Sequence, residues 1–325
     1  VIRRLNRVEY RNSIRDLLGV DYDTSSNFPA DDTGHGFDNI GEVLSMSPLL
    51  LETYVDAAKE IISQVVPTVP GVIHKEQIPG DQFRLDARSL AQMLDASSEQ
   101  IARGDEPPEP GMLELSYYQE AAAMAELRIE QGGQYEIRLN LIAQEDYVDN
   151  QFDENSCEFI FSLEGEILLK RQFVRQNDVP FQFDFKRNLQ PGKYALTAVV
   201  SPLSAKPQIR NLRLQIKSVE LLGPENERFY DRPEGYRRFF PRDVPTDAKD
   251  RRVYAQELLK PFASKAFRRP VEDDSLSRLV ELAESVYSQG ATFESGIAKA
   301  MTAVIASPRF LFREETLLDD SNEEY

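Results

Sequence analysis

Apolar residues recur at helical spacing at both ends of the chain and at every second position in its middle. Over residues 1–66, leucine, isoleucine and valine recur three and four positions apart, first up to Gly19 and then from Leu50 to Val65. This spacing is typical of amphipathic helices. Ser47 and Pro48 predict the start of the second helix, because serine caps free backbone amides and proline suits the first helical turn.

The middle of the chain, residues 72–223, changes to a period of two. Apolar side chains alternate with polar ones in several stretches, among them 135–141, 159–163 and 194–200. Such alternation places apolar residues on one face of a strand. Turn-forming pairs such as Gly132-Gly133 separate the stretches. Many short alternating strands predict an antiparallel β-sandwich of the jelly-roll type.

The last third, residues 224–325, returns to helical spacing. Thr246 or Asp247 is a candidate cap for a helix in which Pro261 predicts a kink or break, since proline removes one hydrogen bond and clashes with the preceding turn. Asp273 and Thr292 predict the starts of two more helices.

These patterns predict an α+β multidomain fold in which an antiparallel β-sandwich lies between two all-α modules. The predicted domains are an N-terminal helical module over 1–71, the sandwich over 72–223 and a C-terminal helical module over 224–325. A helical piece of about 66 residues has a marginal core by itself. We therefore expect the two helical modules to pack together.

Charge and cysteine content exclude several classes of protein. The 325 residues carry 38 Lys and Arg against 55 Asp and Glu, a net charge of −17. Nucleic acid is not an expected partner, because binding phosphates needs clustered basic residues. No apolar run approaches the roughly 20 residues that span a membrane.

The single cysteine, Cys157, excludes an internal disulfide, and a buried, inert thiol is favoured over a reactive one. Because the chain starts at Val1, we expect it to begin inside a longer protein.

Histidine offers one candidate pocket. The chain has only His35 and His74, so a histidine-rich metal site is not expected. His35 lies close in sequence to Asp32 and Asp38, and an imidazole among carboxylates is a candidate site for proton chemistry. The alternative, which we favour, is a loop histidine that hydrogen-bonds its own turn. We nominate no catalytic residue.

An acidic loop and three tyrosines are candidate ligand-binding groups of the sandwich. Calcium prefers several oxygen ligands on a flexible loop, so Asp146, Asp149 and Asp153 are candidate ligands; the alternative is a solvated acidic loop. Sugar binding uses exposed aromatic rings, and the chain has no tryptophan. The candidate stacking residues are therefore Tyr117, Tyr118 and Tyr147, although packing in or beside the sheet is the favoured alternative.

Two short basic islands stand out in this acidic chain, Arg237-Arg238 and Arg268-Arg269. One interpretation is that they bind an acidic partner domain. We favour the other, in which they pair with acids of the neighbouring module and hold the two helical modules together.

Two motifs go beyond periodicity. The first is Arg4-Leu5-Asn6-Arg7-Val8-Glu9-Tyr10, followed by Phe28-Pro29-Ala30-Asp31-Asp32-Thr33-Gly34-His35-Gly36-Phe37; the second is Ala266-Phe267-Arg268-Arg269-Pro270. With these motifs the chain resembles planctomycete-type multidomain proteins that string domains of unknown function between c-type cytochrome domains. Its middle region is similar to the calcium-dependent carbohydrate-binding jelly rolls of such proteins.

The resemblance implies export to the periplasm or cell envelope. It implies covalent haem only in neighbouring domains of a longer parent, because this chain has no Cys-x-x-Cys-His motif. We expect no cofactor in this chain, with calcium as the one candidate ion.

The leading hypothesis is a non-catalytic scaffold and binding fragment of an exported, cytochrome-associated protein, whose sandwich recognises an extracellular polysaccharide or a protein partner. Two alternatives stay open: part of a redox enzyme whose haem domain lies outside this chain, and a structural cell-envelope protein.

Overall fold

The computed structural model divides the chain into two compact units. One, here called the helical unit, combines Val1–Val72 with Arg232–Tyr325; the other, the sandwich unit, is Ile73–Asp231. Residues 224–231 thus group with the strands. The structure describes residues 2–31, 47–91, 110–146, 153–176, 178–203 and 210–314, and for Ile2 and Glu314 it describes the backbone alone.

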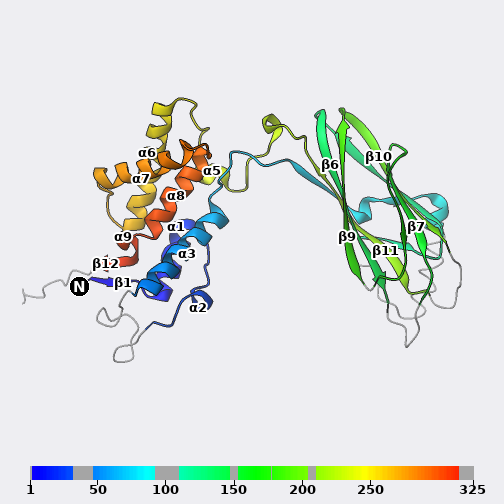
Figure 1. Ribbon diagram of the computed structural model, residues 1–325, viewed down its shortest axis with the longest axis horizontal. Coiled ribbons are helices and arrows are strands. Elements are labelled where there is room, and N and C mark those ends of the chain that lie inside the picture. The colour runs from blue at the N-terminus through cyan, green and yellow to red at the C-terminus, as the bar shows by residue number, and fades with distance from the viewer. Residues whose placement is uncertain are drawn as a thin grey trace, which may run out of the picture. The chain divides into compact units, whose positions relative to one another are not determined.

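The helical unit consists of helices from both ends of the chain and one small sheet (Figure 1). Its elements are β1 (Ile2–Arg4), α1 (Arg7–Leu18), α2 (Thr24–Asn27), α3 (Pro48–Val65), α5 (Tyr236–Phe239), α6 (Ala248–Phe267), α7 (Asp273–Tyr287), α8 (Phe293–Ile305), α9 (Pro308–Leu311) and β12 (Phe312–Glu314).

Local capping fixes where these helices begin and end. Asn6 and Glu9 form a capping box at the start of α1, and Gly19 ends that helix in a left-handed conformation with φ 74°. The Ser47 hydroxyl accepts the amide of Leu50 at 3.1 Å, which confirms the predicted start of α3. Of the predicted kink or break at Pro261, the break is wrong, since α6 continues through this residue to Phe267. The helix is held there by packing, because Leu259 and Ala263 are fully buried on either side.

The two helical segments share one hydrophobic core, as the sequence led us to expect. Aromatic rings from both segments meet in it, with the Tyr10 centroid 5.4 Å from Phe28 and 5.9 Å from Phe310. β1 pairs antiparallel with β12, and the Leu5 amide donates to the Leu311 carbonyl at 2.7 Å. The ends of the described chain are thereby joined by backbone hydrogen bonds.

The sandwich unit is built from two antiparallel sheets (Figure 1). One has the order β3-β5-β10-β7-β8; the other has the order β2-β11-β6-β9, with β4 also pairing β11. The strands are β2 (Lys75–Pro79), β3 (Arg84–Leu85), β4 (Leu113–Ser116), β5 (Ala121–Ile129), β6 (Gly133–Glu145), β7 (Cys157–Leu163), β8 (Glu166–Phe173), β9 (Val179–Leu189), β10 (Gly192–Pro202) and β11 (Leu212–Leu222), with the 3-10 turns η1 (Gly80–Gln82) and η2 (Glu227–Phe229).

Alternating burial confirms the predicted fold class of an antiparallel sandwich between helical segments. Tyr135, Ile137, Leu139 and Leu141 of β6 point into the core, and residues between them are partly exposed. Burying alternate side chains along strands such as β5, β6 and β7 gives the sandwich a core of its own.

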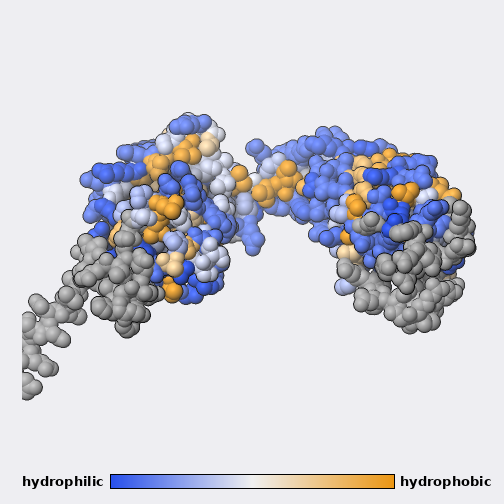
Figure 2. All heavy atoms as spheres, turned by 60° about the horizontal axis from the view of Figure 1, so that its bottom comes forward, coloured by the Kyte–Doolittle hydropathy of each residue, from blue (hydrophilic) through white to orange (hydrophobic). Residues whose placement is uncertain are grey.

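Polar residues predominate on the face that Figure 2 shows. Figure 2 shows hydrophilic residues over most of the visible face of each unit, with apolar residues in small patches. Scattered exposed apolar side chains are normal in soluble folds, so such a residue indicates a site only when its neighbours do too. Within the described part of the chain, no helix is both long and apolar enough to cross a bilayer.

Candidate functional site

A depression of about 790 Å³ lies on the sandwich unit, over β3, β5 and β10. It is lined by Asp81 and Gln82 of η1, Arg84 of β3, Met124, Ala125 and Glu126 of β5, Glu164 of the turn after β7, and Lys193, Tyr194 and Ala195 of β10. Its volume falls within the range of about 300–1,000 Å³ that is usual for small-ligand sites.

Strand register sets the floor of this depression on the outer face of the sheet. Met124 lies opposite Arg84 on one neighbouring strand and opposite Thr197 on the other. Its strand neighbours Ala123 and Ala125 are buried in the core, so Met124 points outward, and it is 55% exposed. The floor therefore offers a flexible apolar side chain beside charged ones.

Close backbone packing positions the wall formed by η1. A Cβ on Gly80 would lie 1.9 Å from the carbonyl oxygen of Ile216, so the turn sits against β11 at a distance that only glycine allows. Phe83, directly after the turn, is buried in the sandwich core. This anchoring fixes Asp81 and Gln82, which lie between these two residues.

The remaining walls carry charges of both signs. Lys193 Nζ lies 2.8 Å from Glu126 Oε1, with both side chains well exposed. Glu164 has a left-handed φ of 49°, its amide donates to the Ala195 carbonyl at 2.9 Å, and its carboxylate accepts the Ala195 amide. Arg84 has no ion pair among the described residues. The depression thus presents hydrogen-bond acceptors, donors and the Arg84 guanidinium, which no described carboxylate pairs with, around an apolar floor.

Two of the three tyrosines predicted for sugar stacking, Tyr117 and Tyr118, are described by the structure and contact other parts of the protein. Tyr117 is 1% exposed, so its ring offers no face to a ligand. The Tyr118 hydroxyl accepts the amides of Asn211 at 3.0 Å and Leu212 at 2.9 Å and donates to the Asp153 carboxylate. The burial of Tyr117 and the hydrogen bonds of Tyr118 agree with the alternative of packing in or beside the sheet. Tyr147 lies outside the described residues.

The predicted calcium ligands are met by protein donors where the structure describes them. Asp153 is 4% exposed and accepts from Tyr118 and from the Asn155 amide, the latter at 2.8 Å. Asp146 forms an ion pair with Arg213. Asp149 lies outside the described residues. No three His, Cys, Asp or Glu side chains come together as a metal site in the part of the chain that the structure describes.

The structure describes the second histidine and the cysteine, but not the residues of the candidate histidine pocket. The candidate pocket residues Asp32, His35 and Asp38 lie outside the described residues. His74 Nδ1 is 2.6 Å from Asp231 Oδ2, at the two ends of the sandwich unit. Cys157 is fully buried, and this burial raises the pKa of its thiol to about 12, which agrees with an inert thiol.

The depression was not foreseen from the sequence. One signal for it was available: Met124 is an apolar residue at an outward position of an alternating strand. That signal names one residue only, because period two does not show which outward side chains of other strands lie beside it.

Comparisons with known proteins agree with this architecture. Residues 3–67 match the family PSD3, described as a protein of unknown function (DUF1587), and residues 254–315 match PSD5, described as a protein of unknown function (DUF1595). Domains of unknown function therefore flank the sandwich, as the two sequence motifs indicated. No curated protein matches the chain.

The middle region resembles carbohydrate-binding modules in structure. One is the CBM36-1 domain of a multidomain xylanase from the hindgut metagenome of Trinervitermes trinervoides, at 9% identity and TM-score 0.28, covering 46% of this chain and 98% of that one. A second is the mannan binding module from Man5C, at 12% identity and TM-score 0.27, covering 45% and 97%. A third is the C-terminal CBM6 of LamC from Zobellia galactanivorans, at 11% identity and TM-score 0.26, covering 46% and 100%. No residue role is transferred from them.

Proposed function

We propose that this chain is a non-catalytic binding and scaffold fragment, and that its sandwich unit recognises a polysaccharide in the depression over β3, β5 and β10. The observation that carries the proposal is the lining of that depression, in which charged groups of both signs surround an exposed methionine.

Sugar rings need this combination of groups. Their hydroxyls both donate and accept hydrogen bonds, and carboxylates, guanidinium and ammonium groups supply the complementary partners. The ring carbons carry hydrogens that pack against apolar side chains such as Met124. Lys193 and Glu126 form an exposed ion pair, which is worth little, so the two side chains are free to turn toward a ligand at small cost.

The wider context rests on the two sequence motifs. We propose that the parent protein is exported, that it is of the planctomycete type, and that haem is carried by neighbouring domains rather than by this chain. In this proposal the helical unit is the scaffold and the sandwich unit is the part that binds.

The test is a glycan array followed by calorimetry on the full chain, with calcium and with a chelator. Met124→Arg fills the floor of the depression, and we expect it to weaken binding at least about tenfold, as the loss of 1.4 kcal/mol would. Ile167→Arg is the matched control. Ile167 is 54% exposed on the same outer sheet face, in the row that runs from Met124 through Thr197 and Ser162.

Three results would overturn the proposal, two of which concern the glycan array and the control variant. One is the absence of any glycan ligand at millimolar concentration in either calcium condition. The other is binding that Ile167→Arg weakens as much as Met124→Arg does. Binding that survives Met124→Arg but disappears with the chelator also contradicts it, since the site would then be a calcium loop.

A further inference from the structure

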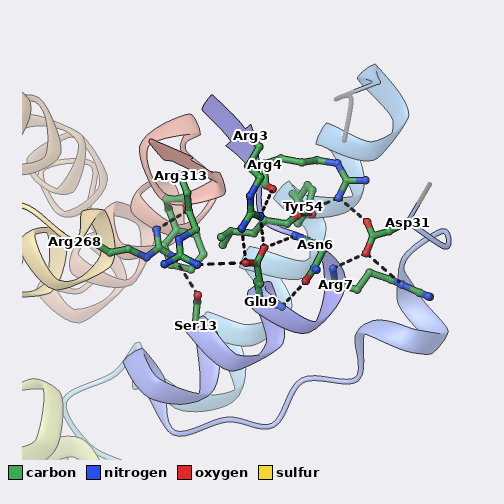
Figure 3. Close-up of polar contacts among 12 residues, drawn as sticks. Arg3, Arg4, Asn6, Arg7, Glu9, Ser13, Asp31, Tyr54, Arg268 and Arg313 are labelled. Atoms are coloured by element: carbon green, nitrogen blue, oxygen red, sulfur yellow. Dashed lines mark hydrogen bonds and ion pairs between the residues drawn. The ribbon is translucent and has the colours of Figure 1, made fainter. Parts of the chain in front are cut away.

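One carboxylate in the helical unit accepts hydrogen bonds from two arginines and a backbone amide. Glu9 accepts from Arg3 Nη1 at 2.6 Å and Nη2 at 2.8 Å, from the Asn6 amide at 3.1 Å and from Arg313 Nη1 at 3.3 Å (Figure 3). The short bidentate pair with Arg3, whose side chain is buried, is the strong one. Among the residues that the structure describes, Arg313 therefore has only a long contact with a carboxylate that Arg3 already binds.

Arg268 lies beside this group with no carboxylate bonded to it. Its Nη2 donates to the Ser13 hydroxyl at 3.0 Å and its Nη1 to the Phe310 carbonyl at 3.2 Å. The guanidinium carbon is 5.5 Å from the centre of the Phe310 ring. Among the described residues, Arg268 forms no ion pair. Its two hydrogen bonds to described residues go to neutral groups, and Glu9 acts on it through charge without a hydrogen bond between them.

The surrounding side chains add to the excess of positive charge. Arg4 Nη1 donates to Asp31 at 2.7 Å, and Arg7 Nε is 3.8 Å from the same carboxylate. The cluster in Figure 3 thus holds five arginines, Arg3, Arg4, Arg7, Arg268 and Arg313, against Glu9 and Asp31. In a chain with a net charge of −17, this is a local reversal of sign.

Two like charges side by side repel each other unless an anion lies between them. Burial, and after it the neighbouring Arg313, lower the pKa of Arg268 against the smaller, opposing effect of Glu9. Guanidinium nevertheless stays protonated in proteins, so the repulsion persists in the folded unit. An oxyanion that both groups contact would relieve it.

We propose that Arg268 and Arg313 together form a binding site for an oxyanion, a carboxylate or phosphate group. Both side chains reach solvent, with Arg313 45% exposed. Each guanidinium has N–H groups left over from its present contacts, in the planar arrangement that matches an oxyanion. The Ser13 hydroxyl, which accepts from Arg268, keeps its own proton to donate.

The experiment measures binding to the full chain by calorimetry and by thermal shift at constant ionic strength. Inorganic phosphate and a blocked tri-glutamate peptide are the two probes, and chloride is the reference. We expect one of the probes to raise the melting temperature more than chloride does. The tighter of the two identifies the source as a free phosphate or a carboxylate on a polypeptide.

Three variants locate the site. Arg268→Gln and Arg313→Gln are expected to weaken binding about 10–100-fold, because each removes hydrogen bonds to a charged group. Arg269→Gln is the matched control, since it removes the same charge from the next residue, which is exposed and forms no ion pair in the described part of the chain. Arg313→Gln also covers the case in which Arg268→Gln unfolds, because the Arg313 side chain forms a single hydrogen bond to the described residues, the long one to Glu9.

The proposal is overturned if phosphate and peptide stabilise the chain no more than chloride. It is equally overturned if Arg269→Gln loses as much affinity as Arg313→Gln, because the effect would then be general attraction to positive charge.

Discussion

The two units achieve a closed core in different ways. The sandwich unit is one continuous stretch, Ile73–Asp231, whereas the helical unit is assembled from two segments that this stretch separates. The ends of the sandwich lie together: β2 pairs antiparallel with β11, with Lys75 opposite Leu222, and His74 contacts Asp231. A domain whose ends meet can be inserted into another with little disturbance.

Because of this difference, the stability of the helical unit depends on the contacts between its two segments. Closing a flexible loop of the sandwich's length costs entropy, whereas a folded sandwich with paired ends removes most of that cost. The contacts that then join the two helical segments are the β1–β12 pair, the shared aromatic core, and single bonds such as Lys265 Nζ to the Asp16 carbonyl at 2.8 Å. We expect the sandwich to fold alone and each helical segment to need the other.

The largest effect is expected from cutting the chain at the unit boundaries. A fragment of residues 73–231 should unfold cooperatively and keep Cys157 unreactive toward thiol reagents. A fragment of residues 1–72 should show little cooperative structure, because its buried faces lack their partners. Circular dichroism melting and thiol labelling measure both. A cooperative melt of fragment 1–72 by itself would remove the asymmetry between the units.

The helices and strands could be predicted from the sequence because the signals that define them are local. Period two and period 3.6 decide which side chains face a core, and caps such as Ser47-Pro48 and Gly19 act within one turn. Both signals are local. The packing of the two helical modules also followed from a local argument, that each is too short to bury a core.

Contacts between distant positions were beyond such arguments. We expected Arg268 to pair with an acid of the other module; it does bond to the N-terminal segment, but to the hydroxyl of Ser13, 255 positions away. Arg237 pairs with Asp243 of its own segment. Likewise, the depression needs the register that puts Arg84 opposite Met124. Spacing along the chain predicts neither the bond between Arg268 and Ser13 nor the pairing of Arg84 with Met124, because both depend on how separate elements align.

Removing one aromatic ring from each core sharpens the comparison. Phe310→Ala removes a fully buried ring that packs on Tyr10 and lies under the Arg268 guanidinium. It should destabilise the helical unit by about 3–5 kcal/mol. Denaturant unfolding followed by circular dichroism measures this, and labelling of Cys157 should stay slow, because that thiol lies in the other unit's core.

Phe161→Ala is the reciprocal variant. Phe161 is fully buried in the sandwich, on the same strand as Cys157. A similar loss is expected there, now with faster labelling of Cys157. Accelerated labelling in Phe310→Ala would show that the two units unfold together, which contradicts the independence of the sandwich.

The smallest effect concerns Glu9, the shared carboxylate of the helical unit. Hydrogen bonds from Arg3, and secondarily the Asn6 amide, lower the pKa of Glu9 from 4.5 to about 2 against the opposing effect of burial. Because the folded pKa lies below the unfolded one, the contribution is fully present above about pH 4.5 and is lost as the pH falls toward 2. Glu9→Gln should therefore cost about 2 kcal/mol at pH 7 and much less at pH 2–3. Urea unfolding of the helical unit across this range measures the difference, with Glu281→Gln, an exposed site on α7, as the control that should cost nothing measurable. If Glu9→Gln lowers the free energy of unfolding equally at pH 7 and pH 2.5, Glu9 acts through its shape at the helix cap and not through its charge. The ion pair between Glu9 and Arg313 would then contribute nothing to joining the two helical segments.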